Sequence, residues 1–191
     1  MANGPATGSE NFPQRNGSDQ DIHEKLGETV TLYRYIPQES VTDVLNKGIT
    51  IESHELGNPA LEDIFSEEAT KRGIQIDRRS AIFAYPRHPS QMRHRDVAST
   101  NQVLIKFVVD PGIIAIVTDS ATYGEAERRF DRGELGLVPD WAGAYWDQAK
   151  TLKEYLSEGH NGGVDDVRDF DSPEVLIAES IPNDRITVIN E

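Results

Sequence analysis

The chain of 191 residues carries a net charge of −14, because 33 acidic side chains outnumber 19 basic ones. This length suffices for one domain with a sizeable core, whereas the acidic balance argues against nucleic-acid binding through bulk charge, which requires Lys and Arg at the phosphates. There is no cysteine, so disulfides, thiolate nucleophiles and cysteine-based zinc sites are excluded. Neither a signal-peptide pattern nor an apolar run of roughly 20 residues is visible, so we expect a cytoplasmic protein without membrane contact.

The beginning of the chain differs in composition from the rest. Residues 1–27 are rich in Gly, Asn, Ser, Gln and Pro and have almost no apolar content. Such a segment cannot bury enough surface to offset the entropy of the chain. We therefore predict a disordered tail, followed by a single domain over 28–191. That domain opens with a β-branched and aromatic strand over 29–36, which Pro37 ends.

Two helices are predicted after this strand. The first covers about residues 38–47 and ends at Gly48, although the capping-box spacing of Ser40 and Asp43 also allows a start there. The second begins at Asn58, where an N-cap residue precedes a proline at the first helical position, and Gly73 closes it.

The rest of the chain alternates between short apolar runs and helical patterns. We predict, in order, a short strand at 81–85, a hairpin of strands 102–109 and 113–117, helices at 120–132 and 141–156, a Gly- and Asp-rich loop at 160–171, and strands from Val175 and over 186–189. This order indicates an α+β protein rather than regularly alternating βα units.

A carboxylate stands at the entrance to the strand predicted from Val175. Pro173 breaks whatever precedes it, and the apolar, β-prone residues 175–177 follow, so Glu174 lies where a loop enters a core sheet. A rigid strand end can hold a catalytic carboxylate. The alternative is an ordinary solvated charge.

A run of positive charge interrupts the acidic chain between Arg78 and Arg95. It holds five arginines, two histidines and no acidic residue, whereas the other 173 residues hold 14 basic and all 33 acidic side chains. Because the planar guanidinium matches phosphate in a bidentate way, the run indicates an anion site. The alternative is that these arginines pair with surface carboxylates.

The first predicted strand carries a second candidate cation. Alternation places Tyr33 and Tyr35 on one face and Arg34 on the other. An inward Arg34 would need a partner such as a ligand phosphate or a carboxylate, whereas the alternative is an edge-strand arginine in solvent. Metal patterns are weak: His88 and His94 lack ligand spacing, and the acidic residues of 165–171 lack the order of a calcium loop, so we predict no metal site.

Taken together, three stretches resemble the ADP-ribosyltransferase-like superfamily, and most nearly its bacterial toxin branches such as the DNA-modifying DarT type. The stretch LYRYIP at 32–37, followed by 40–48, resembles the opening strand, helix and turn of the family. The stretch RSAIFAY at 79–85 resembles its middle strand, and PEVLI at 173–177, continuing through 180–186, resembles its closing segment. The resemblance implies an α+β fold whose split β-sheet core has flanking helices.

The resemblance also implies a substrate and a set of roles. NAD would be the substrate, and Glu174 would be the catalytic residue that hydrogen-bonds the nicotinamide ribose and stabilises an oxocarbenium-like transition state. The residues implied in NAD binding are Arg34 and Tyr33 at the dinucleotide, Ser80 and Tyr85 at the nicotinamide and its ribose, and Arg79 and Arg87 at the pyrophosphate.

Departures from the family pattern leave the acceptor open. Arg34 stands where several toxin branches have His, a Ser-Thr-Ser strand is missing, and Ser172 replaces the first glutamate of a Glu-x-Glu pair. Modification of protein arginines is therefore not implied, and the acceptor could be a protein, a nucleic acid, a small molecule or water. The alternative functions are an inactive member of the fold that binds anions or proteins, and an acidic protein that binds a basic partner through its charge.

Overall fold

The computed structural model describes residues 29–51, 57–91, 101–158, 170 and 172–189. The predicted tail over 1–27 lies outside this part of the chain, as does nearly all of the predicted loop over 160–171. Within the described residues, no helix combines the length and the apolar character that a membrane span requires.

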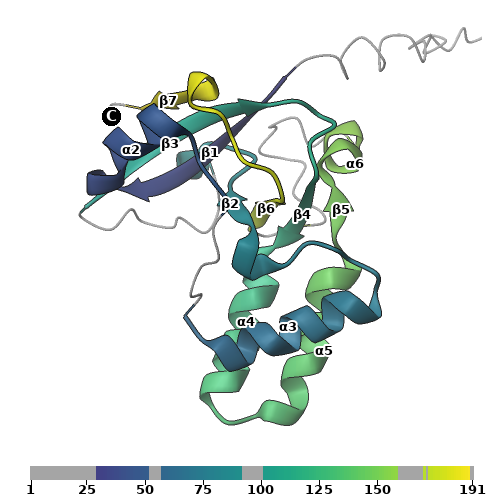
Figure 1. Cartoon of the computed structure of the whole chain (residues 1–191). Helices are drawn as coiled ribbons and strands as arrows, with labels where there is room; N and C mark the ends of the chain where they lie inside the picture. Colours follow the sequence, from purple (N-terminus) through teal and green to yellow (C-terminus); the bar gives the residue numbers. More distant parts are fainter. Residues whose placement is uncertain (1–28, 52–56, 92–100, 159–169, 171, 190–191) are drawn as a thin grey trace, which may run out of the picture.

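Two antiparallel sheets form the centre of the described chain, which makes it an α+β protein as predicted (Figure 1). The strands of the first sheet lie in the order β1 (Val30–Pro37), β3 (Gln102–Val109) and β7 (Ile186–Val188). Those of the second lie in the order β2 (Ile82–Ala84), β6 (Pro173–Ile177), β4 (Ala115–Asp119) and β5 (Lys150–Thr151).

A backbone bridge joins the two sheets where β1 passes the end of β2. The amide of Tyr33 donates to the carbonyl of Tyr85 at 2.9 Å, and the amide of Tyr85 donates back to Tyr33 at 2.7 Å. Because β2 in turn pairs with β6, the strands β1, β2 and β6 are consecutive neighbours across the junction.

The predicted hairpin of 102–109 and 113–117 is wrong. Both strands form, but β3 pairs with β1 and β7, whereas β4 pairs with β5 and β6. The reason lies in the residues between them: the carbonyl of Ile114 accepts from the amide of Ala178 at 2.9 Å, and its own amide donates to the Glu179 carboxylate at 2.7 Å. These contacts lead the chain from the first sheet into the second instead of back along β3.

Three helices cover the second sheet on the side away from the first sheet (Figure 1). They are α3 (Pro59–Lys71), α4 (Ser120–Asp131) and α5 (Val138–Asp147). Every residue of β6 is buried. Its side chains alternate between two cores, since Val175 and Ile177 join the core between the sheets and Leu176 joins the core under the helices. The strand that carries Glu174 is thus held from both faces.

The single helix predicted over 141–156 is interrupted. After α5, residues of β5 pair with β4, and a new helix, α6 (Leu152–Ser157), follows. The cause is a capping box, in which the Thr151 hydroxyl accepts from the Glu154 amide while the Glu154 carboxylate accepts from the Thr151 amide.

Short helical elements complete the described chain. Residues 38–47 form a 3-10 turn, η1 (Gln38–Ser40), and then the helix α2 (Val41–Lys47). Ser40 precedes α2 but its side chain makes no capping hydrogen bond, so the expected capping box is absent there. The other 3-10 turns are η2 (Arg78–Ser80), η3 (Pro89–Gln91), η4 (Leu135–Leu137) and η5 (Asn183–Arg185).

Candidate functional site

Glu174 lies at the start of β6, in the second position of the strand. It pairs with Thr118 of β4, and the register between β2 and β6 places Ala84 opposite the following residue, Val175. Glu174 is only 8% exposed. It is therefore a buried carboxylate, and the alternative of a solvated surface charge is wrong.

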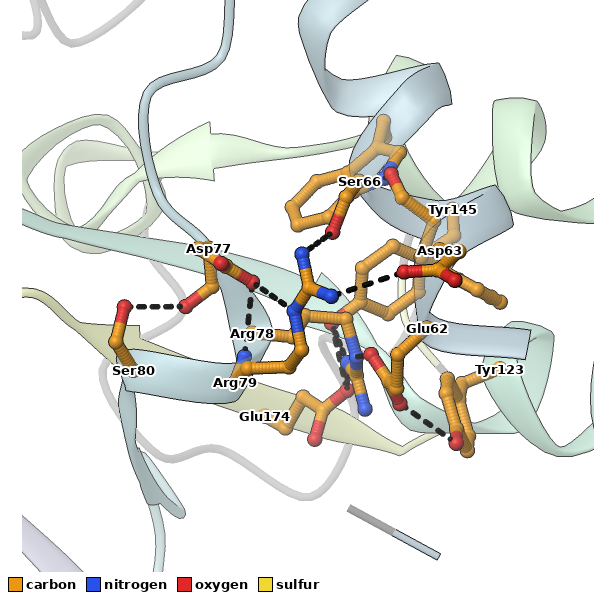
Figure 2. A network of polar contacts seen from close by, with 12 residues as sticks. Glu62, Asp63, Ser66, Asp77, Arg78, Arg79, Ser80, Tyr123, Tyr145 and Glu174 are labelled. Atoms are coloured by element: carbon orange, nitrogen blue, oxygen red, sulfur yellow. Dashed lines mark hydrogen bonds and ion pairs between the residues drawn. The ribbon is translucent and has the colours of Figure 1, made fainter. Parts of the chain in front are cut away.

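Beside this carboxylate, polar side chains from five elements come together around the guanidinium of Arg78. Figure 2 shows the group, which we call the Arg78 cluster. Its members are Glu62 of α3, Arg78 of η2, Tyr123 of α4, Tyr145 of α5 and Glu174 of β6. The cluster therefore spans the boundary between the helical layer and the second sheet.

The two oxygens of Glu174 have different surroundings. Oε1 accepts a hydrogen bond from Nη1 of Arg78 at 3.0 Å and another from the Tyr145 hydroxyl at 2.9 Å, and Arg78 also donates to that hydroxyl. Within the described residues, Oε2 has no hydrogen-bond partner. Figure 2 shows one carboxylate oxygen turned toward Arg78 and the other turned away from it.

Arg78 is enclosed by aromatic rings as well as by carboxylates. Its guanidinium carbon lies 4.0 Å from the centre of the Tyr123 ring, 4.9 Å from Tyr145 and 5.0 Å from Phe83. Its Nε is 3.3 Å from Oε2 of Glu62. Burial would lower the pKa of Arg78, but the field of Tyr145, Glu174 and Glu62 raises it above its ordinary value. Arg78 is therefore a permanent cation, favoured by cation–π contacts.

The two tyrosines of the cluster act as hydrogen-bond donors. The Tyr123 hydroxyl donates to Oε1 of Glu62 at 2.9 Å. Burial raises the pKa of Tyr123, and the neighbouring charge of Glu62 raises it further. Burial likewise raises the pKa of Tyr145, and the charge of Glu174 adds to the effect. Both phenols therefore keep their protons at neutral pH.

A second set of bonds fixes the chain just before Glu174. Oδ1 of Asp119 accepts from the amide of Ser172 at 2.9 Å and from the amide of Ala121 at 3.1 Å, so it also caps α4. The carbonyl of Ser172 accepts in turn from the amide and the hydroxyl of Ser120. These contacts tie the entrance of β6 to the end of β4 and the start of α4.

Arg34 points inward, which settles the alternative left open by the sequence. It lies on the face of β1 that also carries the buried Leu32 and Ile36, and its Nη1 donates to the carbonyl of Phe83 at 3.2 Å. Burial lowers the pKa of Arg34. Because the ring of Phe83 also lies against Arg78, Phe83 connects Arg34 with the Arg78 cluster.

The other predicted NAD-binding residues of the β1–β2 junction lie close to one another. Tyr33 and Tyr85 are joined by their backbones, and the ring of Tyr33 packs edge-on against His88 with 5.3 Å between ring centres. Continuing the β2–β6 register by one residue places Tyr85 beside Glu174. The junction therefore brings the first, middle and closing stretches of the family resemblance side by side.

The arginines of the run at 78–95 have different surroundings. Arg79 forms ion pairs with Asp63 at 3.0 Å and Asp77 at 3.2 Å and a hydrogen bond with Ser66 (Figure 2), as the alternative of pairing with carboxylates expects. The Ser80 hydroxyl donates to the Asp77 carbonyl at 3.4 Å.

Of the remaining three arginines of the run, the structure describes only Arg87. Arg87 is half-buried and hydrogen-bonded to Tyr155. Burial raises the pKa of Tyr155, and the charge and hydrogen bond of Arg87 offset part of this rise. Arg93 and Arg95 lie outside the described residues.

Sequence reasoning missed Glu62, Tyr123 and Tyr145. One signal was present, because Glu62 stands beside Leu61 and three residues before Phe65, within the apolar face of the predicted helix. The tyrosines carried no such signal, since their spacing is that of ordinary core residues. In the part of the chain that the structure describes, no group of three or more acidic or histidine side chains could hold a metal ion.

The geometry offers a carboxylate with one oxygen held by a cation and a phenol and the other oxygen open to a donor. Such a group can stabilise positive charge or accept a proton from a bound hydroxyl. Neither a protein-family model, nor a curated protein, nor a solved structure matches this chain.

Proposed function

We propose that the chain is an NAD-dependent ADP-ribosyltransferase-like enzyme that cleaves the nicotinamide–ribose bond, with Glu174 as its catalytic carboxylate. The observation that carries this proposal is Oε2 of Glu174, which has no partner among the described residues although the side chain is buried. Among the described residues, the fully enclosed side-chain atoms without a hydrogen-bond partner include Oε2 of Glu62 but not Oε2 of Glu174, so Oε2 of Glu174 is the carboxylate oxygen available to a donor from a ligand. A ribose hydroxyl of NAD is such a donor.

The proposed chemistry requires little besides this carboxylate. The bond between C1′ of the ribose and the nicotinamide nitrogen breaks, and its electron pair leaves with nicotinamide, which departs neutral. The positive charge that develops on the ribose is stabilised by the negative charge of Glu174. An acceptor hydroxyl, amine or water then bonds to C1′ and loses its proton, so that ADP-ribose is transferred or NAD is hydrolysed.

The β1–β2 junction supports the position proposed for the dinucleotide. Arg34 supplies a cation next to Phe83, and the backbones of Tyr33 and Tyr85 pair beside it, with the Tyr33 ring on the opposite face of β1 against His88. NAD is an anion, so a half-buried arginine at this place favours its pyrophosphate or its ribose. Arg79 would serve the pyrophosphate only after exchanging its carboxylate partners, Asp63 and Asp77.

A second function is favoured by a different observation. Glu174 already has an ion pair with Arg78 at 3.0 Å, which is the arrangement of a structural carboxylate in a core. The corresponding function is an inactive member of the same fold that binds an anion or a protein partner without cleaving NAD.

Release of nicotinamide from NAD, measured on wild type and Glu174→Gln at low and high salt, tests the proposal. We expect release by wild type and a loss of about 100-fold in the variant, because the carboxylate acts mainly in the transition state. Glu179→Gln is the matched control, since Glu179 is an exposed glutamate on the same segment and a glutamine keeps the side-chain oxygen that accepts from the Ile114 amide. Equal rates in wild type and Glu174→Gln would contradict the proposal. Calorimetric binding of NAD without release would favour the inactive member instead.

A further inference from the structure

The Arg78 cluster contains two tyrosines in nearly equivalent positions. Each hydroxyl lies 2.9 Å from a buried glutamate oxygen, Tyr123 at Glu62 and Tyr145 at Glu174. Each ring also packs on the Arg78 guanidinium, at 4.0 Å and 4.9 Å respectively. The two phenols differ in the glutamate to which they donate, and the Tyr145 hydroxyl in addition accepts a hydrogen bond from Nη1 of Arg78.

Only one of these glutamates has a free oxygen that a ligand can reach. Glu62 is 1% exposed: its Oε1 accepts from Tyr123, and its Oε2, 3.3 Å from Nε of Arg78, makes no hydrogen bond but is fully enclosed. Glu174 has both of its described donors at Oε1, which leaves Oε2 without one. The direction of Oε2 is therefore set by whatever fixes Oε1.

Two donors fix Oε1 because one would leave the carboxylate free to turn. With Arg78 alone, the carboxylate could rotate about its Cγ–Cδ bond, whose torsion is intrinsically broad. The Tyr145 hydroxyl approaches from α5 and Arg78 from η2, so the two donors come from separate elements. Tyr145 is fully buried, and a packed core leaves water little room to replace its hydroxyl.

Arg78 is in turn held against movement. Four aromatic rings surround its guanidinium, and Glu62 supplies a second carboxylate at Nε, whereas Glu174 contacts Nη1. If the Arg78 guanidinium moved with one of the two carboxylates, its ion pair with the other would be broken. Arg78 is therefore immobile, and its hydrogen bond to Oε1 limits the orientations that the Glu174 carboxylate can adopt.

We infer that Tyr145, together with Arg78, is a positioning residue that aims Oε2 of Glu174 at the ligand, whereas Tyr123 contributes to the stability of the same cluster without acting on Glu174. This inference rests on the proposed function for its catalytic consequence. The holding of Glu174 by the Tyr145 hydroxyl is a separate physical statement, and it can be measured without turnover.

The test compares Tyr145→Phe with Tyr123→Phe. Each change removes one hydroxyl from one buried glutamate and keeps the ring that packs on Arg78, so both variants are expected to fold. Tyr145→Phe should lose more thermal stability, because Tyr145 is fully buried and its hydroxyl also accepts from Arg78, whereas Tyr123 is half-buried. Nicotinamide release gives kcat and KM. Carbon-13 NMR of glutamate-labelled protein gives the carboxyl signal of Glu174, which is assigned by its loss in Glu174→Gln.

We expect Tyr145→Phe to shift the Glu174 signal and to lower kcat by at least about 10-fold with KM within about twofold, because a small misplacement of a reacting group costs rate rather than binding. Tyr123→Phe should leave the Glu174 signal in place and keep kcat within about twofold of wild type, since surroundings that do not touch the reacting group affect stability first. Equal effects of the two variants on kcat, or an unmoved Glu174 signal in Tyr145→Phe, would overturn the inference.

Failure of the proposed function has a different signature. If wild type releases no nicotinamide, that function fails and the NMR result alone decides on the positioning of Glu174. A signal that moves in Tyr145→Phe and not in Tyr123→Phe would still support the holding of Glu174 by Tyr145. A signal that moves in neither variant, or equally in both, would overturn it.

Discussion

Replacing Gly48 by alanine should destabilise the protein more than the same change at any exposed glycine. Gly48 ends α2 with φ of +84° and ψ of −170°, and it is buried. A Cβ at this position would lie 2.2 Å from the carbonyl oxygen of Ile181 and 3.1 Å from the amide of Asn183. The close approach arises because Ile49 and Ile181 exchange two backbone hydrogen bonds of 2.8 Å.

Two costs add at this site. The backbone conformation is one that essentially only glycine adopts, and forcing another residue into it costs about 1–3 kcal/mol. The contact at 2.2 Å involves a backbone oxygen, which cannot swing away as the end of a side chain can, so the bridge must shift at a further cost of about 1–3 kcal/mol. We therefore expect a loss of about 4 kcal/mol, a large part of the roughly 5–15 kcal/mol that stabilises a typical domain.

Gly73→Ala is the matched control for the Gly48 prediction. Gly73 also has a positive φ, of +69°, but a Cβ there would meet nothing within 4 Å. The Gly73→Ala change should therefore cost only the free energy of placing an alanine at a positive φ, about 1 kcal/mol. Urea denaturation followed by circular dichroism gives both free energies of unfolding. The reasoning is refuted if Gly48→Ala loses no more stability than Gly73→Ala, because the contact with Ile181 would then carry no cost.

Two further changes test how helix ends and ion pairs contribute. Asn58→Ala removes the oxygen that accepts from the amides of the first turn of α3 at 3.2 and 3.4 Å, and urea denaturation should show a loss of about 1 kcal/mol, whereas Asn58→Ser should restore most of it. Arg72→Met removes the partner that lowers the pKa of Asp147 and contributes to lowering that of Glu68. Because both pKa values are depressed in the folded protein, the stability difference between wild type and this variant should be present at pH 7. It should shrink as the pH falls below the ordinary pKa values of 3.8 for Asp147 and 4.5 for Glu68. A difference that grew in acid would contradict the ion-pair explanation.

The elements that local chemistry determines were predictable from the sequence. The strand at 102–109 and the helix start at Asn58 follow from β-branched content and from an N-cap before proline, and both stand in the structure as expected. Strand pairing was not predictable in this way. The turn at Pro111 and Gly112 has the composition of a hairpin, and only the distant residues Ala178 and Glu179 decide that the chain enters another sheet.

The candidate site shows the same division between local and distant information. Glu174 could be singled out because proline and an apolar strand surround it in the sequence. Its surroundings could not, since the residues that contact it are supplied by helices and a turn far along the chain. Arg78 and Arg79 are neighbours with identical side chains, yet one is 5% exposed between two glutamates and the other pairs with surface carboxylates. Only the direction of η2 separates them.

Because Arg78 contacts two buried carboxylates, only some variants of the cluster can distinguish a loss of activity from a loss of folding. Arg78 stands between Glu62 and Glu174, so its removal would leave two buried carboxylates without their counter-ion, and losing one partner of a buried pair costs about 3–5 kcal/mol. An inactive Arg78 variant would therefore be expected whether Glu174 is catalytic or only structural. The tyrosine hydroxyls differ, because their removal leaves Arg78 and both carboxylates in place. The stability of the helical layer and the orientation of Glu174 depend on the same guanidinium, and the two can be distinguished only by changes that keep it.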